Sequence, residues 1–186
     1  METLTTKRLV LKAPTLADVP EITRKIGNWN VARMLARVPH PYVPEDCAPW
    51  IAHITERNAA GLDMAYAIHR QGLIGVMSVE AFDGVPVFGY WLAETAWGQG
   101  YATEAGVAVL RHAFQTQSAS EIKSSVFHDN EPSLKVQKKL GFEVASIGTT
   151  YSVSRKADVP SIKTTLSRQA FDNAVNARCA TDPTSI

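Results

Sequence analysis

The chain has 186 residues, of which 45% are hydrophobic and 20% are charged, a balance typical of a folded globular protein rather than a disordered one. Its 19 basic and 18 acidic residues leave a formal charge of +1, which argues against a nucleic-acid partner because nucleic-acid-binding proteins usually carry a strong excess of Lys and Arg. No segment is apolar enough for a membrane span, the first residues lack a signal-peptide pattern, and Cys47 and Cys179 form no ligand-spaced pair, so we expect one cytoplasmic domain without a metal site.

The first quarter of the chain shows one strand pattern and then helical periodicity. Residues 8–11 predict a strand, and apolar residues at helical spacing follow it from about 15 to 26. A short helix and an irregular loop are expected over 28–42. A further helix is expected over about 44–59 because a proline begins this segment and a glycine follows it.

The middle of the chain changes from a strand period to a helix period. Three strands are predicted over 64–69, 73–82 and 85–93, and the short polar or glycine-containing segments between them indicate an antiparallel meander. From residue 100 to 113, small and apolar residues recur at three and four positions, which predicts a helix.

The last third of the chain predicts a strand, a helix and two more strands. These elements are expected over 121–128, 130–140, 143–153 and about 159–166. The residues from 173 to 186 have little to bury, so we expect a mobile tail there. The element order predicts a mixed α/β (α+β) fold with a strand–helix–strand unit at its centre.

A strand that runs through two glycines into a helix is the most informative segment of the sequence. Between residues 89 and 105, Gly98 and Gly100 come directly before a helix whose first residues are small. The unpaired N–H groups and the dipole of such a helix terminus bind phosphate or pyrophosphate without a cationic side chain. Two glycines can also simply make a tight turn. A Rossmann fingerprint is excluded because Thr103 replaces its third glycine, and a Walker loop is excluded because no Gly-Lys-Ser/Thr sequence follows.

The stretch from Gly89 to Ala105 resembles the acetyl-CoA-binding motif of the GCN5-related N-acetyltransferases, most closely the RimJ/RimL branch of that superfamily. Residues 6–11 resemble the opening strand of this branch, Gly75 matches its usual third strand, and 130–142 resemble its Asn-x-x-Ser…Lys-Leu-Gly-Phe helix. The two long motifs occur in the family's order and separation.

The resemblance covers about residues 5–168 and implies a single acetyltransferase domain over 1–172. It implies a mostly antiparallel sheet of six to seven strands with about four flanking helices. The implied reaction is the transfer of an acetyl group from acetyl-CoA to an amine, by direct attack of the amine on the thioester.

The resemblance also implies which residues contact the coenzyme. The pyrophosphate is expected at the turn and helix start formed by Trp97, Gly98, Gln99, Gly100, Tyr101, Ala102 and Thr103. The pantetheine arm is expected at the backbone of Leu92 and Ala93 and at Asn130, and Ser133 is expected to stabilise or protonate the departing thiolate. Asn130 and Ser133 could equally be an N-cap and an ordinary first-turn serine.

The general base is the point where this sequence departs from the family. The branch often carries an acid two residues before the Gly-Tyr of its central strand, and here that position is Val87. Glu80 on the preceding strand is the first substitute, ahead of Asp83 and His128, although Glu80 could also be a solvated strand residue. The missing acid leaves open the alternative of a non-catalytic acyl-CoA-binding module.

The acceptor amine is expected to contact the segment from residue 28 to residue 60. Trp29, Arg33 and Tyr42 are the candidate acceptor-binding residues in this segment. Arg33 and Arg37 could bind an acidic acceptor, but a solvated helix face is the better interpretation of this pair. A protein N-terminus, an amino acid, a polyamine or an aminoglycoside would each fit as the acceptor. A homodimer through the last strands or the region of Phe171 is compatible with the sequence.

Overall fold

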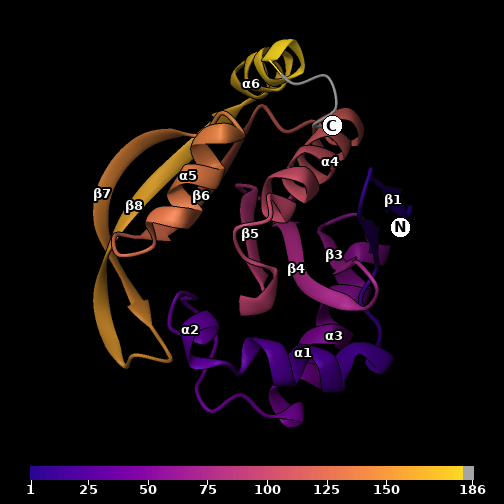
Figure 1. The fold of residues 1–186 in the computed structure, drawn as a ribbon, viewed down its shortest axis with the longest axis vertical. Coiled ribbons are helices and arrows are strands. Elements are labelled where there is room, and N and C mark those ends of the chain that lie inside the picture. Colours follow the sequence, from indigo (N-terminus) through magenta and orange to yellow (C-terminus); the bar gives the residue numbers. More distant parts are fainter. Residues whose placement is uncertain (182–186) are drawn as a thin grey trace.

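A single mixed sheet organises the chain in the computed structural model, which describes residues 1–181 (Figure 1). The spatial order of the strands is β1-β2-β3-β4-β5-β6-β8-β7. All neighbours in this sheet are antiparallel except β5 and β6, which run parallel. The strands are β1 (Leu4–Thr5), β2 (Val10–Lys12), β3 (Met64–His69), β4 (Leu73–Glu80), β5 (Val87–Leu92), β6 (Glu121–Phe127), β7 (Glu143–Ser152) and β8 (Ala157–Ser167).

Helices cover both faces of the sheet. The first three pack with one face around a small core, and α4, α5 and α6 lie on the other face (Figure 1). Two short 3₁₀ turns, Leu16–Asp18 and Glu94–Ala96, complete the regular structure. The helices are α1 (Val19–Ile26), α2 (Trp29–Ala32), α3 (Pro44–Ala59), α4 (Tyr101–Thr116), α5 (Glu131–Lys139) and α6 (Arg168–Thr181).

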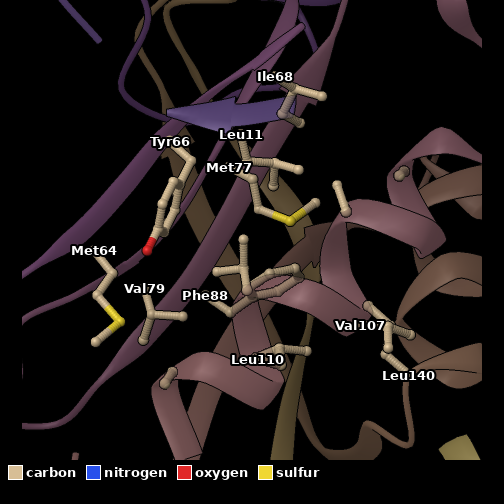
Figure 2. Packing of buried hydrophobic residues seen from close by; sticks show 14 of the residues in the cluster. Leu11, Met64, Tyr66, Ile68, Met77, Val79, Phe88, Val107, Leu110 and Leu140 are labelled. Atoms are coloured by element: carbon tan, nitrogen blue, oxygen red, sulfur yellow. The ribbon is translucent and has the colours of Figure 1, made fainter. Parts of the chain in front are cut away.

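The larger core lies between α4 and the central strands. Leu11, Met77 and Phe88 come from three of these strands and are fully buried, and Leu110 of α4 packs against them (Figure 2). The apolar period that predicted α4 is therefore its buried face. Burying a large aliphatic or aromatic side chain contributes about 1.5–3 kcal/mol, so this cluster holds α4, and with it the start of that helix, firmly against the sheet.

The predicted fold class is confirmed, with one strand more than expected. The sheet contains eight strands within the described residues, where six to seven were predicted. The additional strand is β1, a two-residue segment in which Leu4 lies opposite Leu11 and Thr5 opposite Val10. So short a segment carries no period from which a strand could be predicted.

The expectation of a mobile tail from residue 173 is wrong for residues 173–181, which continue α6. Phe171 and Val175, four residues apart, are 2% and 7% exposed, and the Phe171 ring lies 5.6 Å from that of Phe114 on α4. Val175 therefore gives this segment an apolar contact that anchors it. Residues 182–186 of the expected tail lie outside the described part of the chain.

The two parallel strands separate soon after they meet. Val87 of β5 lies opposite Lys123 of β6, and this is the one registered pair between them. Helix α4 connects the two strands, as a crossover between parallel strands requires. Beyond Val87, the side of β5 that faces β6 has no regular strand partner. The predicted strand–helix–strand unit is thus present, with a separation between its strands.

Gly75 on β4 should be intolerant of a side chain. A Cβ there would overlap the carbonyl oxygen of Trp91 and lie 2.6 Å from Cδ2 of Leu92, whereas a Cβ at Gly89 would have nothing within 4 Å. We expect Gly75→Ala to lower the free energy of unfolding by about 2 kcal/mol because overpacking strains the sheet. Chemical denaturation measures this change, with Gly89→Ala as the matched control that stays close to wild type. Equal stability of the two variants would contradict the close packing of β4 against β5.

Candidate active site

The start of α4 is an uncapped helix terminus behind a two-glycine turn. Gly98 and Gly100 have φ angles of 73° and 81°, in the left-handed region that favours glycine. Gly100 occupies the N-cap position and has no side chain to cap the helix, and the first intrahelical bond runs from the N–H of Glu104 to the Gly100 carbonyl at 3.1 Å. The preceding N–H groups, from Tyr101 to Thr103, therefore have no intrahelical acceptor, which is the arrangement that binds anions.

A cation lies beside this terminus. The Nε of Arg8 is 2.6 Å from Oε2 of Glu104, its Nη1 donates to the carbonyl of Gln99 at 3.0 Å, and its guanidinium lies 4.5 Å from the ring centroid of Tyr101. Burial opposes ionisation of Glu104, but hydrogen bonds from Thr6 and Arg8 outweigh it and lower its pKa. Arg8 thus offsets the negative charge of Glu104. The sequence motifs did not single out Arg8, although it lies in the opening strand that carries the resemblance.

At the end of β5, the backbone of Ala93 is hydrogen-bonded within the protein, whereas the N–H of Leu92 faces away from β4. The N–H of Ala93 donates to the carbonyl of Ile74 at 2.8 Å, and the Ala93 carbonyl accepts a bond within the following 3₁₀ turn. Because backbone groups alternate in direction along a strand, the N–H of Leu92 points away from β4 and toward β6. The Phe88 carbonyl, on the same side, accepts from the Ser124 hydroxyl of β6 at 2.8 Å. The N–H of Ala93 is therefore unavailable to pantetheine, whereas its carbonyl can accept a second hydrogen bond, so the expected pairing at Ala93 stays a prediction for the carbonyl alone.

The polar side chains of the turn stabilise the turn itself. The Nε1 of Trp97 donates to the carbonyl of Leu92 at 2.8 Å, and the Nε2 of Gln99 donates to the carbonyl of Thr95 at 3.1 Å. Trp97 remains 44% exposed, so one part of its ring borders the solvent beside the helix terminus.

A tyrosine and a serine meet across the separated strands. The side chain of Asn130, the N-cap of α5, accepts from the N–H of Ser133 at 3.3 Å. The Oγ of Ser133 lies 2.9 Å from the hydroxyl oxygen of Tyr90 on β5. Burial raises the pKa of Tyr90 to about 12, and the hydrogen bond with Ser133 acts against this rise. Tyr90 therefore keeps its proton at neutral pH. Sequence reasoning missed Tyr90, although it stands inside the quoted motif.

Glu80 lies at the end of β4 with both carboxylate oxygens hydrogen-bonded. Its Oε1 accepts from the hydroxyl of Ser78 at 2.8 Å, and its Oε2 accepts from Nη2 of Arg37 at 2.9 Å. Arg37, for which a solvated helix face is the preferred interpretation of the sequence, is solvated at 82% exposure but lies after α2 and not in a helix. Its guanidinium forms an ion pair with the candidate base.

Glu80 and the Tyr90–Ser133 pair lie on opposite faces of the sheet. Tyr90 is opposite Met77, which belongs to the larger core, and strand alternation directs Glu80 to the other face with Val76 of the smaller core. Gly89 of β5 pairs with Ser78 and so lies on the same face as Glu80, and a Cβ at Gly89 would meet open space there. The sheet therefore presents a hydroxyl pair on one side and a carboxylate on the other.

The two weaker candidates for the base lie in other environments. Asp83 accepts from Nη2 of Arg57 at 3.0 Å, and this hydrogen bond lowers the pKa of the Asp83 carboxyl. Arg57 also pairs with the buried Asp63 at 2.7 Å, so Asp83 belongs to an ion-pair cluster at the end of α3. His128 follows β6 with an exposed side chain, and its N–H donates to the Pro160 carbonyl.

The three candidate acceptor residues lie in two environments, the ends of α2 and the edge of the smaller core. Trp29 at the start of α2 is 45% exposed and its ring lies 5.0 Å from that of His40. Arg33 caps the end of the same helix. Tyr42 instead packs against the smaller core, where burial and the nearby Cys47 thiol raise the pKa of its hydroxyl. Tyr42 is thus a packing residue of the helical layer.

Arg155, in the turn between β7 and β8, connects three parts of the site. Its Nη1 is 2.9 Å from Oδ2 of Asp129, its Nε donates to the Arg33 carbonyl at 2.6 Å, and its guanidinium lies 4.9 Å from the ring centroid of Phe127. The hydrogen bond from Arg155 lowers the pKa of the Asp129 carboxyl. The hairpin consequently reaches α2 and the loop before Asn130 (Figure 1). No local motif pointed to Arg155.

Comparison with known protein families shows which family has this combination of helix terminus, separated strands and α5. The family model described as acetyltransferase (GNAT) domain matches residues 8–143, which span the helix terminus, both separated strands and α5. The chain belongs to the GNAT acetyltransferase family. It is accordingly an acetyl-CoA-dependent N-acyltransferase, as the two motifs predicted.

Relatives of this GNAT protein share its fold at low sequence identity. The uncharacterized N-acetyltransferase p20 of Bacillus licheniformis is 24% identical over 161 residues, covering 83% of this chain and 90% of that protein. Mycobacterium smegmatis RimJ, solved with CoA-disulfide, has a TM-score of 0.83 at 16% identity, covering 98% of this chain and 95% of RimJ. RimL, a ribosomal L7/L12 alpha-N-protein acetyltransferase solved with coenzyme A, has a TM-score of 0.79 at 19% identity, covering 91% of this chain and 99% of RimL.

The described part of the chain contains neither a metal cluster nor a membrane-spanning helix. No group of three or more His, Cys, Asp or Glu side chains there is arranged to hold a metal ion. None of the helices between residues 1 and 181 has the length and apolar character needed to cross a membrane.

The raised pKa of Tyr90 predicts a loss of stability at high pH. Its ordinary value is 10 and its folded value is about 12, so the folded state holds this proton more tightly and the resulting stability is present below pH 10 and lost as the pH rises to about 12. We expect the melting temperature of wild type to fall more steeply across this window than that of Tyr90→Phe, which cannot titrate. Thermal melts across this range of pH measure the difference, and parallel curves would contradict the raised pKa.

Proposed function

We propose that this GNAT protein transfers an acetyl group from acetyl-CoA directly to a primary amine, on a protein N-terminus or a small molecule, through a ternary complex. The observation that carries the proposal is the contact between Tyr90 on β5 and Ser133 on α5, the helix that follows β6, whose hydroxyl oxygens lie 2.9 Å apart. The hydroxyl pair suits a leaving thiolate, and the uncapped start of α4 suits the diphosphate of the same coenzyme.

The coenzyme would bind between the start of α4 and the start of α5. The N–H groups of Gly98 and Gly100 to Thr103 would bind the pyrophosphate, while Arg8 neutralises the Glu104 carboxylate that would otherwise repel it. The N–H of Leu92 would hydrogen-bond the pantetheine arm or the acetyl carbonyl, where a fixed donor stabilises the developing oxyanion. The Asn130 side chain, which already orients Ser133, would line the same arm.

The leaving sulfur would interact with Ser133. As the neutral amine nitrogen attacks the carbonyl carbon, the carbon–sulfur bond breaks and the sulfur leaves as a thiolate. The nitrogen then loses its second proton, which ends on the sulfur and gives the amide and the free thiol of coenzyme A. Tyr90 would donate its hydroxyl hydrogen to the Ser133 oxygen, which directs the Ser133 hydroxyl hydrogen toward the thiolate. Because Tyr90 keeps its proton up to a pKa of about 12, this donor is present at every physiological pH.

The attacking amine must first lose a proton, since an alkylamine with a pKa near 10 is mostly protonated at pH 7. Glu80 would accept this proton on the sheet face opposite Ser133, beside the open space at Gly89. Trp29 and the backbone around Arg33 would border the acceptor, and Arg155 would fix that border by holding α2 to the loop before Asn130. Catalysis would then come mainly from orientation of the two substrates.

A ribosomal or other protein N-terminus is supported as the acceptor class by fold similarity. Besides RimL, the solved structures of the same fold include a ribosomal-protein-S5-alanine acetyltransferase from Vibrio fischeri, with a TM-score of 0.79, 18% identity and coverage of 92% of this chain and 99% of that one. Small-molecule amines remain the second acceptor class.

Substitution of Gly100 should abolish coenzyme binding. A β-branched residue at a φ of 81° strains the turn and displaces the N–H groups that follow it, and its Cβ would lie 3.4 Å from the Arg8 guanidinium. We expect calorimetric titration with acetyl-CoA to show a Kd raised about 100-fold or more in Gly100→Val. The matched control is Gly61→Val, because Gly61 has a φ of 70° and open space but lies in the loop after α3. Loss of binding in both variants, or in neither, would remove the predicted location of the coenzyme.

Ser133→Ala and Glu80→Gln should separate chemistry from binding. Each removes a proposed proton-transfer group, and such groups typically contribute about 100-fold or more to turnover. We expect kcat for thiol release with an amine panel to fall about 100-fold while the Kd for acetyl-CoA stays unchanged.

The matched control for Glu80→Gln is Glu56→Gln, which replaces a carboxylate by an amide on the exposed face of α3. Unchanged turnover in Glu80→Gln would remove Glu80 as the base and leave the fold and coenzyme site intact. Coenzyme binding without thiol release for any amine would favour the non-catalytic acyl-CoA-binding module.

A further inference from the structure

Strand β7 is an unprotected edge of the sheet. It is the last strand in the order, runs over ten residues from Glu143 to Ser152, and contains neither Lys nor Pro. Three apolar residues on it are strongly exposed, with Val144 at 54%, Ile147 at 76% and Tyr151 at 56%. Natural edge strands are usually short, charged, bulged or covered. The irregularity of β7 lies between Val144 and Ser146, so the rest of the strand is regular.

The hydrogen-bonding groups that β7 turns outward can be identified from Pro160. The carbonyl of Pro160 accepts from the N–H of His128 at 2.8 Å, so Pro160 directs its backbone toward β6. Thr149, which lies opposite Pro160, must therefore direct its N–H and C=O away from β8. By alternation, Ile147 and Tyr151 do the same. Ile147, Thr149 and Tyr151 alternate along the strand, so their side chains also lie on one face of it. Ile147 and Tyr151 are two of the exposed apolar residues named above.

We propose that β7 pairs with β7 of a second copy of this chain, antiparallel and about a two-fold axis at Thr149, to form a homodimer with one continuous sheet. In this register Ile147 lies opposite the partner's Tyr151, Tyr151 lies opposite the partner's Ile147, and the two Thr149 residues face each other. Each of the three residues donates one hydrogen bond to the partner and accepts one. β-branched–aromatic pairs and Thr–Thr pairs are favourable neighbours across antiparallel strands.

The register follows from symmetry and from the outward groups. A two-fold axis perpendicular to the sheet leaves every side chain on the same side of the sheet. Two residues that face each other across the axis must therefore be an even number of positions apart, so the axis lies at a residue and not between two residues. An axis at Thr150 would present backbone groups that already bond β8. An axis at Ile147 or Tyr151 would place one of these apolar residues opposite itself and remove both mixed pairs. Thr149 is thus the centre that pairs every exposed apolar side chain of the regular segment.

Charge supports a second copy as the occupant. Residues 144–152 carry no charge, so no like charges face each other across the axis. The Glu143 end of one strand lies beside the partner's hairpin turn, which carries the exposed Lys156. The same turn contacts the segment that follows α2, where the N–H of Val153 donates to the Ala36 carbonyl at 2.9 Å. The interface is therefore continuous with the hairpin that borders the acceptor side, while the proposal itself does not depend on which reaction is catalysed.

The test is the mass of the full chain in solution by sedimentation equilibrium. We expect wild type to be a dimer at micromolar concentration and Thr149→Pro to raise the dimer dissociation constant about 100-fold or more, because two central N–H donors are lost. The substitution removes an N–H directed away from β8, so the monomer loses no ladder bond and should keep its melting temperature. Ile147→Lys should also give monomers, because it replaces the apolar contact with the partner's Tyr151 by a charged side chain that edge pairing would desolvate.

Val85→Lys is the control, because Val85 is similarly exposed at 53% but lies in the loop between β4 and β5. This variant should remain dimeric, and its dissociation would show that added charge alone separates the subunits. A monomeric wild type would overturn the proposal. A dimer that survives both Thr149→Pro and Ile147→Lys would also overturn it, because the contact would then lie on another surface. Acetyl-CoA binding by each monomeric variant shows that the fold is retained.

Discussion

The separation of β5 from β6 is the constraint on which the site depends. The strands are parallel and share the single registered pair of Val87 and Lys123, after which the N–H of Leu92 has no ladder partner. An unpaired backbone donor in a buried strand is costly, so the fold requires a hydrogen-bonding group to enter there. The crossover helix α4 begins beside the same end of β5, and its free N–H groups favour an anion. A ligand with a polar arm and a diphosphate satisfies both requirements.

The pleat of β5 and β4 distributes the chemistry between two faces. Tyr90 points to the side of α4 and α5, where it meets Ser133, while Glu80 points to the side of α1 and α3. A leaving group and an incoming amine approach a carbonyl carbon from different directions, so a proton donor and a proton acceptor on opposite faces suit direct transfer. Arg155 adds rigidity by joining α2 to the loop before α5. The elements that we propose to border the two substrates are therefore connected outside the sheet as well.

Local sequence signals predicted the local parts of this structure well. The glycines at 98 and 100 adopt the left-handed conformation that only a residue without Cβ adopts readily, and Asn130 caps α5 through its side chain. Predictions that depended on a neighbour were less successful. Ala93 belongs to the right motif, but its N–H is taken by Ile74, and no property of either residue alone reveals that bond. The end of the chain was misjudged because α6, anchored by the buried Phe171 and Val175, continues into the expected tail.

The sequence by itself determined the order of the elements, the fold class, the family and the turn that begins α4, because periodicity, capping and glycine conformation act over a few neighbouring residues. Tertiary structure decided that Tyr90 meets Ser133, 43 positions away, and that Arg155 reaches the backbone of Arg33, 122 positions away. It also decided which strand became the exposed edge. Such contacts follow from how whole elements pack and register against one another, and a pattern that spans one element at a time contains no information about the element it will meet.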